Sequence, residues 1–191
     1  MSARRRAVLG GMLLAALTAC ASRVTDYYRL AMVAGASVSG KTGVITVRRI
    51  SLPSYLDRNA INRPGGDYRF ETFDHTEWAE PLGDMLQAIM VEDLAQRLPD
   101  ATILASGSAI GTTPDMVVEI AVQRFDFDAA GRLALVGQIA IKAGPDRALV
   151  AQSGVRAAMA VGGADATASV AAMSVLWAQC ADNVTRLIAD G

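Results

Sequence analysis

The chain has 191 residues, of which 52% are hydrophobic and 19% are charged, and its formal net charge at pH 7 is −1. The near balance of 18 basic and 19 acidic residues argues against a nucleic-acid partner, which would require a basic face. With only two cysteines and one histidine, the sequence gives no basis for a zinc site, and we predict no metal and no cofactor.

The first nineteen residues have the pattern of a bacterial lipoprotein signal. Three arginines at positions 4–6 precede an apolar run, Ala7 to Leu17, that is too short to span a bilayer. The run leads through the small residues Thr18 and Ala19 to a cysteine, as in a lipobox. We therefore predict signal cleavage between Ala19 and Cys20 and attachment of acyl chains to Cys20. The alternative is an ordinary cleaved signal that happens to end beside a cysteine.

Acylation would fix the mature protein to a membrane, because each buried methylene contributes about 0.8 kcal/mol and two or more chains bind stably. The cysteine is followed by Ala21 and Ser22, without the aspartate that retains lipoproteins at the inner membrane under the enterobacterial sorting rule. We expect the periplasmic face of the outer membrane, with a signal at 1–19, a lipidated tether at 20–26 and one domain at 27–191. At about 3.4 Å per residue the tether reaches about 20 Å, so the domain must lie close to the membrane.

The remaining cysteine and the single histidine limit catalysis. If Cys20 carries lipid, Cys180 has no partner for a disulfide, and its apolar position in a predicted helix indicates a small core residue rather than a reactive thiol. His75 lies in a polar stretch, and the chain has no Gly-x-Ser-x-Gly nucleophile motif. We predict no catalytic residue and a surface or capping role for His75.

In the first half of the mature chain the pattern predicts short strands. They are expected at Tyr27 to Leu30, at Val44 to Ile50, and on either side of a turn at Pro64 to Asp67, where they would form a hairpin. Pro53 lacks a backbone N–H and breaks the strand pattern over the segment from Leu52 to Arg58.

Two long amphipathic helices are predicted. The first begins near Pro81 and ends before Pro99, and the second runs from a cap at Asp165 to about Ile188. The three- and four-residue spacing of apolar residues in the first helix predicts a buried stripe opposite a polar face. The stripe comprises Leu82, Met85, Leu86, Ile89, Met90 and Leu94, and the polar face comprises Asp84, Gln87, Glu92 and Gln96.

Between the helices the pattern is that of a sheet. A short strand is expected at Thr102 to Leu104, and three β-rich runs, Met116 to Asp128, Arg132 to Lys142 and Arg147 to Met159, predict an antiparallel meander. The resulting fold class is α/β, a single domain in which a mixed, largely antiparallel sheet packs with two long amphipathic helices.

One motif suggests a nucleotide site. The segment from Gly35 to Thr42 fits the P-loop pattern G-x-x-x-x-G-K-[ST], but a P-loop requires a helix directly after it. Here the β-branched run at 44–47 favours a strand, and an exported protein meets no ATP. We interpret the segment as a flexible surface loop.

Two further segments are distinctive. Leu-Pro-Ser-Tyr-Leu-Asp-Arg at 52–58 follows a strand, and Glu-Trp-Ala-Glu-Pro-Leu at 77–82 opens the first helix. Together with the lipobox, and with Phe125-Asp126 in the meander, these motifs resemble the PqiC family of lipoproteins, the auxiliary lipoproteins of ABC-type transport systems that work with MCE-domain proteins. The likeness covers nearly the whole chain.

The resemblance implies a non-enzymatic accessory at the outer membrane. Such a protein would dock the periplasm-spanning MCE protein, help lipids to pass between the membranes and support membrane integrity, while other proteins supply the ATPase and the permease. The resemblance also implies a homo-oligomeric ring.

The segment broken by Pro53 supplies the candidate partner contacts, Pro53, Tyr55, Leu56 and Arg58, because aromatic residues are enriched at interfaces. Tyr55 and Leu56 could equally cover the edge of the sheet. Two other functions stay open: a periplasmic lipid-binding carrier lipoprotein, and a hydrolase that uses His75.

Overall fold

The structure is a computed structural model that describes residues 24–65, 69–144 and 146–191. The predicted signal, with its cleavage site at Ala19 and Cys20, lies outside the described residues. So does most of the tether.

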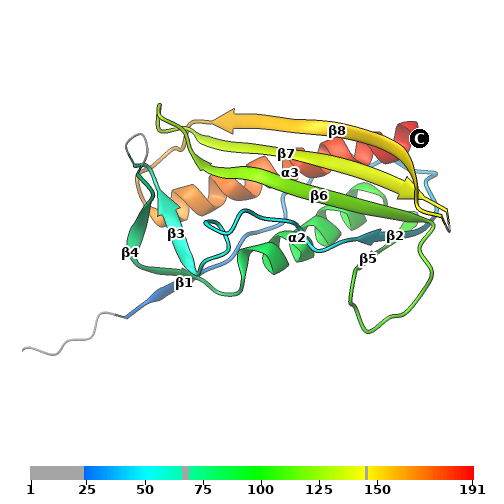
Figure 1. The fold of residues 1–191 in the computed structure, drawn as a ribbon, viewed down its shortest axis with the longest axis horizontal. Coiled ribbons are helices and arrows are strands. Elements are labelled where there is room, and N and C mark those ends of the chain that lie inside the picture. Colours follow the sequence, from blue (N-terminus) through cyan, green and yellow to red (C-terminus); the bar gives the residue numbers. More distant parts are fainter. Residues whose placement is uncertain (1–23, 66–68, 145) are drawn as a thin grey trace, which may run out of the picture.

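The described chain forms one domain with eight strands and two helices (Figure 1). In chain order the elements are β1 (Asp26–Tyr28), β2 (Gly43–Val47), β3 (Ala60–Arg63), β4 (Glu71–Trp78), α2 (Leu82–Arg97), β5 (Ala101–Ala105), β6 (Met116–Phe127), β7 (Leu133–Ala143), β8 (Ala148–Met159) and α3 (Ala166–Asp190).

The larger sheet has five strands in the order β5-β2-β6-β7-β8. Strands β6, β7 and β8 form the antiparallel meander that the sequence predicts, while β2 lies parallel to both β5 and β6. Both helices lie behind this sheet in Figure 1, α2 against β2 and β5 and α3 against β7 and β8. No helix of the described residues covers the opposite face of the sheet.

The smaller sheet has three strands in the order β1-β4-β3 and lies at the end of the molecule where the described chain begins (Figure 1). The antiparallel pair β3 and β4 is the predicted hairpin, and β1 lies parallel to β4. The register between β3 and β4 shifts, and within β4 His75 has a φ of 54°. The fold class is as predicted, but the division into two sheets was not expected.

The apolar stripe of α2 is confirmed, since all six predicted residues are buried. The predicted polar face is partly wrong. Gln87 is buried against β2, where its side-chain amide donates hydrogen bonds to the carbonyl oxygen of Val47 and to Oγ of Ser106. Asp93 and Arg97, at 0% and 1% exposed, are buried on the same helix. The helix is thus covered on two sides.

Helix α3 begins as predicted. The carboxylate of Asp165 accepts a hydrogen bond from the backbone N–H of Ala168 at 2.8 Å and so caps the first turn. At the centre of the core, Trp177 is fully buried, stacks on Phe125 with ring centroids 6.3 Å apart, and donates its indole N–H to the carbonyl oxygen of Leu86. Cys180 is buried, and burial raises the pKa of its thiol to about 12, as expected of a core residue.

The segment from Gly35 to Thr42 is a mostly exposed loop, as the sequence predicts, but it is attached to the rest of the fold. Its backbone is held by α2: Gly35 donates its N–H to Oε1 of Gln96 at 2.8 Å, and Val38 donates to the carbonyl oxygen of Arg97 at 2.7 Å. The stretch leads directly into strand β2, so the P-loop pattern lacks the helix that it requires. Neither α2 nor α3, nor any other helical stretch that the structure describes, has the length and apolarity needed to cross a membrane.

Candidate partner-contact site

The segment with the predicted contact residues follows the C-terminal end of β2 and runs beside β6. The N–H of Arg48 donates to the carbonyl oxygen of Val118, and Ser51 pairs in parallel with Ala121. At Pro53 the missing N–H ends this pairing, and the chain turns with a hydrogen bond from Leu56 N–H to the carbonyl oxygen of Pro53. The segment therefore connects the large sheet to the small one.

The four candidate residues differ in exposure. Leu56 is 3% exposed and belongs to the core, so it has no surface to offer a partner. Pro53 and Tyr55 are half-buried, and Arg58 is exposed. The structure thus brings three of the four residues to the surface of the same turn.

Tyr55 is fixed by a polar network on β6. Its hydroxyl donates a hydrogen bond to Oδ2 of Asp126 at 2.8 Å, and Arg124 donates from Nε to Oδ1 of the same carboxylate. Burial, together with the bond to this carboxylate, raises the pKa of the Tyr55 hydroxyl well above its usual value, so the group stays protonated and keeps donating. The sequence motif therefore places a rigid aromatic ring at the end of the molecule.

The ring of Tyr55 forms one wall of a cavity of about 540 Å³, here called the Tyr55 pocket. Phe70 packs against this ring edge to face, with centroids 5.6 Å apart and planes at 85°. The pocket lies between the β3–β4 hairpin and the end of β6. Its lining also includes Arg58, Asn62, Arg63, Gly65, Arg69, Glu71, Arg124, Asp126, Phe127, Asp128 and Ala129.

The charges that line the Tyr55 pocket are mostly paired. Glu71 faces two guanidinium groups, those of Arg63 and Arg69, with the Arg69 Nη1 to Glu71 Oε1 distance at 3.5 Å. Asp128 pairs with Arg132, just outside the lining, and this arginine and the backbone N–H groups at 130 and 132 lower the pKa of the Asp128 carboxyl. Four arginines and three carboxylates line the pocket, and Arg132 lies beside it, in a chain whose overall charge is slightly negative.

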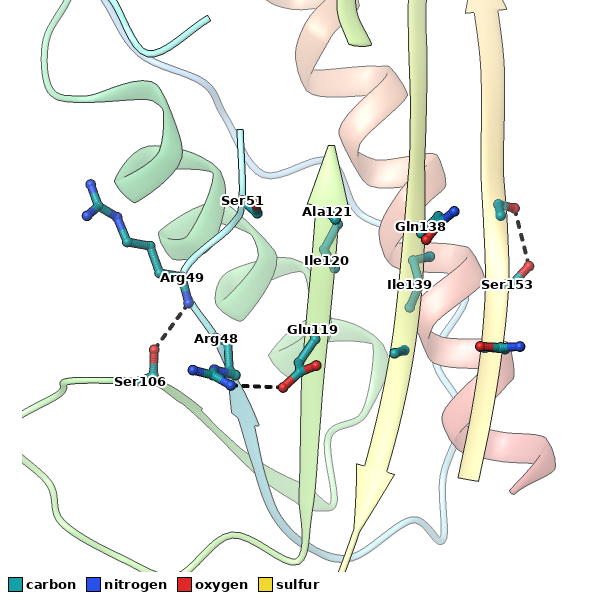
Figure 2. Close-up of a pocket in the computed structure, with 13 residues that line it drawn as sticks. Arg48, Arg49, Ser51, Ser106, Glu119, Ile120, Ala121, Gln138, Ile139 and Ser153 are labelled. Atoms are coloured by element: carbon teal, nitrogen blue, oxygen red, sulfur yellow. Dashed lines mark hydrogen bonds and ion pairs between the residues drawn. The ribbon is translucent and has the colours of Figure 1, made fainter. Parts of the chain in front are cut away.

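A second cavity, of about 780 Å³, lies on the face of the large sheet opposite α2 and α3 and is here called the sheet-face pocket (Figure 2). Figure 2 shows Arg48 in an ion pair with Glu119, at 2.9 Å, and Arg49 extending to the side. The lining includes small residues of β6, β7 and β8 together with exposed polar side chains. These residues are Arg48, Arg49, Ser51, Ser106, Glu119, Ile120, Ala121, Gln138, Ile139, Ala140, Gln152, Ser153 and Gly154.

The sequence reasoning missed most of the Tyr55 pocket. Asp126 was visible only as part of the Phe125-Asp126 motif, and nothing in the local pattern indicates that Phe70, before β4, or Arg124, on β6, approaches Tyr55. Of the other residues considered, Trp78 is 4% exposed and lies in the core, and His75 is exposed on β4.

The comparisons with known proteins agree with this fold. The model of a family described as "ABC-type transport auxiliary lipoprotein component" matches residues 28–185. No curated protein matches the sequence.

Among solved structures, a crystal structure of an uncharacterised protein is 18% identical, with a TM-score of 0.70, and the match covers 86% of this chain and 98% of that one. A DUF330 protein from Xanthomonas campestris is 19% identical, with a TM-score of 0.69, over 84% of this chain and 92% of that one. At these identities the two structures show that the fold is shared. A PelC dodecamer from Paraburkholderia phytofirmans reaches a TM-score of only 0.40 at 15% identity, over 82% of this chain and 95% of that one, and it supports no conclusion about assembly.

Proposed function

The chain belongs to the family of ABC-type transport auxiliary lipoprotein components, which is the PqiC type, and we propose that it docks the MCE-domain protein of its transport system at the outer membrane. The observation that carries this proposal is the family match over residues 28–185, which includes nearly all of the described domain. The family is one of transport accessories rather than of enzymes, so a transporter partner is expected. The MCE protein as that partner rests on the resemblance to the PqiC lipoproteins.

The proposed anchor is the acylated Cys20. Its acyl chains would hold the protein in the inner leaflet of the outer membrane, and the absence of aspartate from positions 21 and 22 supports this address over the inner membrane. The short tether would keep the domain beside the bilayer, where the periplasm-spanning partner ends.

The proposed contact surface is the turn with Pro53, Tyr55 and Arg58. A half-buried tyrosine whose ring is fixed by Asp126 and Phe70 loses little side-chain freedom on binding, which favours it as an interface anchor. The exposed Arg58 beside it offers the planar donor group that is enriched at interfaces. Arrangement of several copies in a ring would multiply this contact around one partner.

The test is a photo-crosslinking amino acid at position 55, followed by mass spectrometry of the captured species from intact cells. Because the substitute is aromatic, it keeps the packing against Phe70. The matched control carries the same crosslinker at Gln138, which is exposed in the sheet-face pocket.

Capture of an MCE-domain protein at position 55 and not at position 138 is the expected result. Capture only of further copies of the chain would assign this turn to a ring interface instead of the partner. Capture only of lipid would contradict docking at this turn and favour the lipid-carrier function.

A further inference from the structure

The end of the molecule that contains the small sheet is also the end from which the tether emerges. Strand β1 begins at Asp26, six residues after the proposed anchor Cys20, so the start of β1 lies within about 20 Å of the lipid attachment point. Figure 1 shows β1 and the β3–β4 hairpin together at this end, with the loop between β5 and β6 at the other. The closeness of the small-sheet end to the bilayer rests on the proposed acylation of Cys20.

The same end exposes large apolar side chains. Val24 is 83% exposed, Tyr27 on β1 is 68% exposed, and Phe70, which directly precedes β4, is 43% exposed. Tyrosine is enriched at membrane interfaces because its ring is apolar and its hydroxyl prefers water. Exposure of these apolar side chains to bulk water is unfavourable, whereas their contact with the headgroups and upper acyl chains of a bilayer is favourable.

Positive charge accompanies them in the Tyr55 pocket. Among the described residues, Arg63 and Arg69 share the single carboxylate of Glu71, so the two guanidinium groups have one negative charge between them. Within the part of the chain that the structure describes, Arg58 forms no ion pair. Two guanidinium groups can hold a phosphate through paired N–H bonds, since their planar donors match its oxygens.

We propose that the small-sheet end of the domain lies on the membrane surface and that the Tyr55 pocket binds the phosphate of a phospholipid headgroup. Arg63 and Arg69 hold the phosphate, and Phe70 lies against the glycerol and the upper acyl chain. The turn with Pro53, Tyr55 and Arg58 lies beside Phe70 and is left for the protein partner. The domain thus presents lipid and partner to each other in one cavity.

The experiment uses the full chain in intact cells grown with [³²P]phosphate, with a benzophenone amino acid at position 70. The acyl and glyceryl groups of the anchor contain no phosphorus, so the label on the purified chain reports a captured phosphate compound. Benzophenone reacts with C–H bonds, so free inorganic phosphate is not captured, and release of the label by phospholipase C identifies a lipid. The control is the same crosslinker at Ile110, which is 68% exposed in the loop at the opposite end.

We expect phospholipase-sensitive label at position 70 and little at position 110. The double variant Arg63→Gln and Arg69→Gln should lower the label about fivefold or more, which is the effect of one basic residue near an anionic surface. Arg48→Gln with Arg49→Gln is the matched control, because these arginines are similarly exposed and are paired to Glu119 and Asp84. This control should leave the label unchanged.

Equal label at positions 70 and 110, or label that is unaffected by loss of Arg63 and Arg69, would overturn the proposal. Capture of protein but no lipid at position 70 would also overturn it, while leaving the docking function intact. Lipid at position 70 without an MCE protein at position 55 would support the lipid site and contradict the docking surface, so the two proposals fail separately.

Discussion

At the scale of single residues, the carboxylate of Asp93 is buried with one of its two oxygens unpaired among the described residues. It is 0% exposed, and its Oδ1 accepts hydrogen bonds from the N–H of Val33 and from Nη1 of Arg97, both at 3.2 Å. Its Oδ2 has no hydrogen-bond partner among the described residues. The same arginine also pairs with Asp182 at 2.7 Å, so Asp93 shares its cation. The pair links α2, α3 and the N-terminal segment.

This environment makes stability depend on pH. Burial raises the pKa of Asp93 from 3.8 to about 6, although Arg97 acts in the opposite direction. Because the folded state binds the proton more tightly than the unfolded chain, the stabilisation that Asp93 provides is present below pH 3.8 and is lost as the pH rises through about 6.

We expect Asp93→Asn, which keeps an acceptor for Val33, to gain stability relative to the wild type as the pH rises. The gain should be about 3 kcal/mol across this window. Urea unfolding of both proteins over a pH series measures it, and the difference between them removes the contribution of other groups. A difference that does not change with pH would show that Asp93 titrates as it does in the unfolded chain.

At the scale of elements, the close approach of β6 and β7 requires a glycine at position 137. Opposite the register shift in β6, a Cβ on Gly137 of β7 would lie 2.7 Å from the carbonyl oxygen of Ala121, which is backbone and cannot move aside. On the neighbouring strand, a Cβ on Gly154 would have no atom nearer than 4.0 Å. The two glycines lie on adjacent strands but differ in this contact.

Gly137→Ala should therefore destabilise the domain by about 1–3 kcal/mol, because the overlap must be relieved by a shift of β6 or β7. Gly154→Ala, on the adjacent strand, should change stability by less than about 0.5 kcal/mol. The midpoints of denaturant unfolding of the two variants measure the loss of stability, provided that the dependence of the unfolding free energy on denaturant concentration is unchanged. Similar losses for both would mean that the cost arises from strand flexibility and not from contact.

The elements also show what sequence periodicity can and cannot predict. The meander, the hairpin, the cap at Asp165 and the apolar stripe of α2 follow from local pattern, because each depends on neighbours within a few residues. The burial of Gln87, Asp93 and Arg97 depends on segments 40 or more residues away, namely β2, α3 and the stretch after β1. From the sequence pattern alone, polar side chains such as these are expected on the exposed face of the helix. Only the tertiary fold shows that other segments cover them.

The same division applies to the candidate site. The motif at 52–58 identified Tyr55 and Arg58, but the cavity around them is assembled from β3, β4 and β6, which belong to two different sheets. Leu56 shares that motif and yet is buried, because a turn sends successive side chains to opposite sides. Sequence distance alone therefore could not separate contact residues from core residues.

At the scale of the whole molecule, the proposed function depends on the short tether. Insertion of twenty Gly/Ser residues after position 22 would add a flexible span of about 25 Å and let the domain leave the membrane surface. We expect the thermal midpoint to stay unchanged while capture of the partner at position 55 and of lipid at position 70 both fall severalfold. The same insertion at position 110, in the exposed loop between β5 and β6, is the control and should leave both captures unaltered.

The N-terminal stretch that α2 and α3 hold joins the two ends of the described chain. The backbone N–H of Ala31 donates to Oγ of Ser174, 143 residues later, so the first described segment is completed by the last helix. Contacts between such distant parts of a chain form slowly, because the long intervening segment must first be brought together. The stretch after β1 therefore reaches its native contacts only once α3 is in place, and the two ends of the domain complete their folding together.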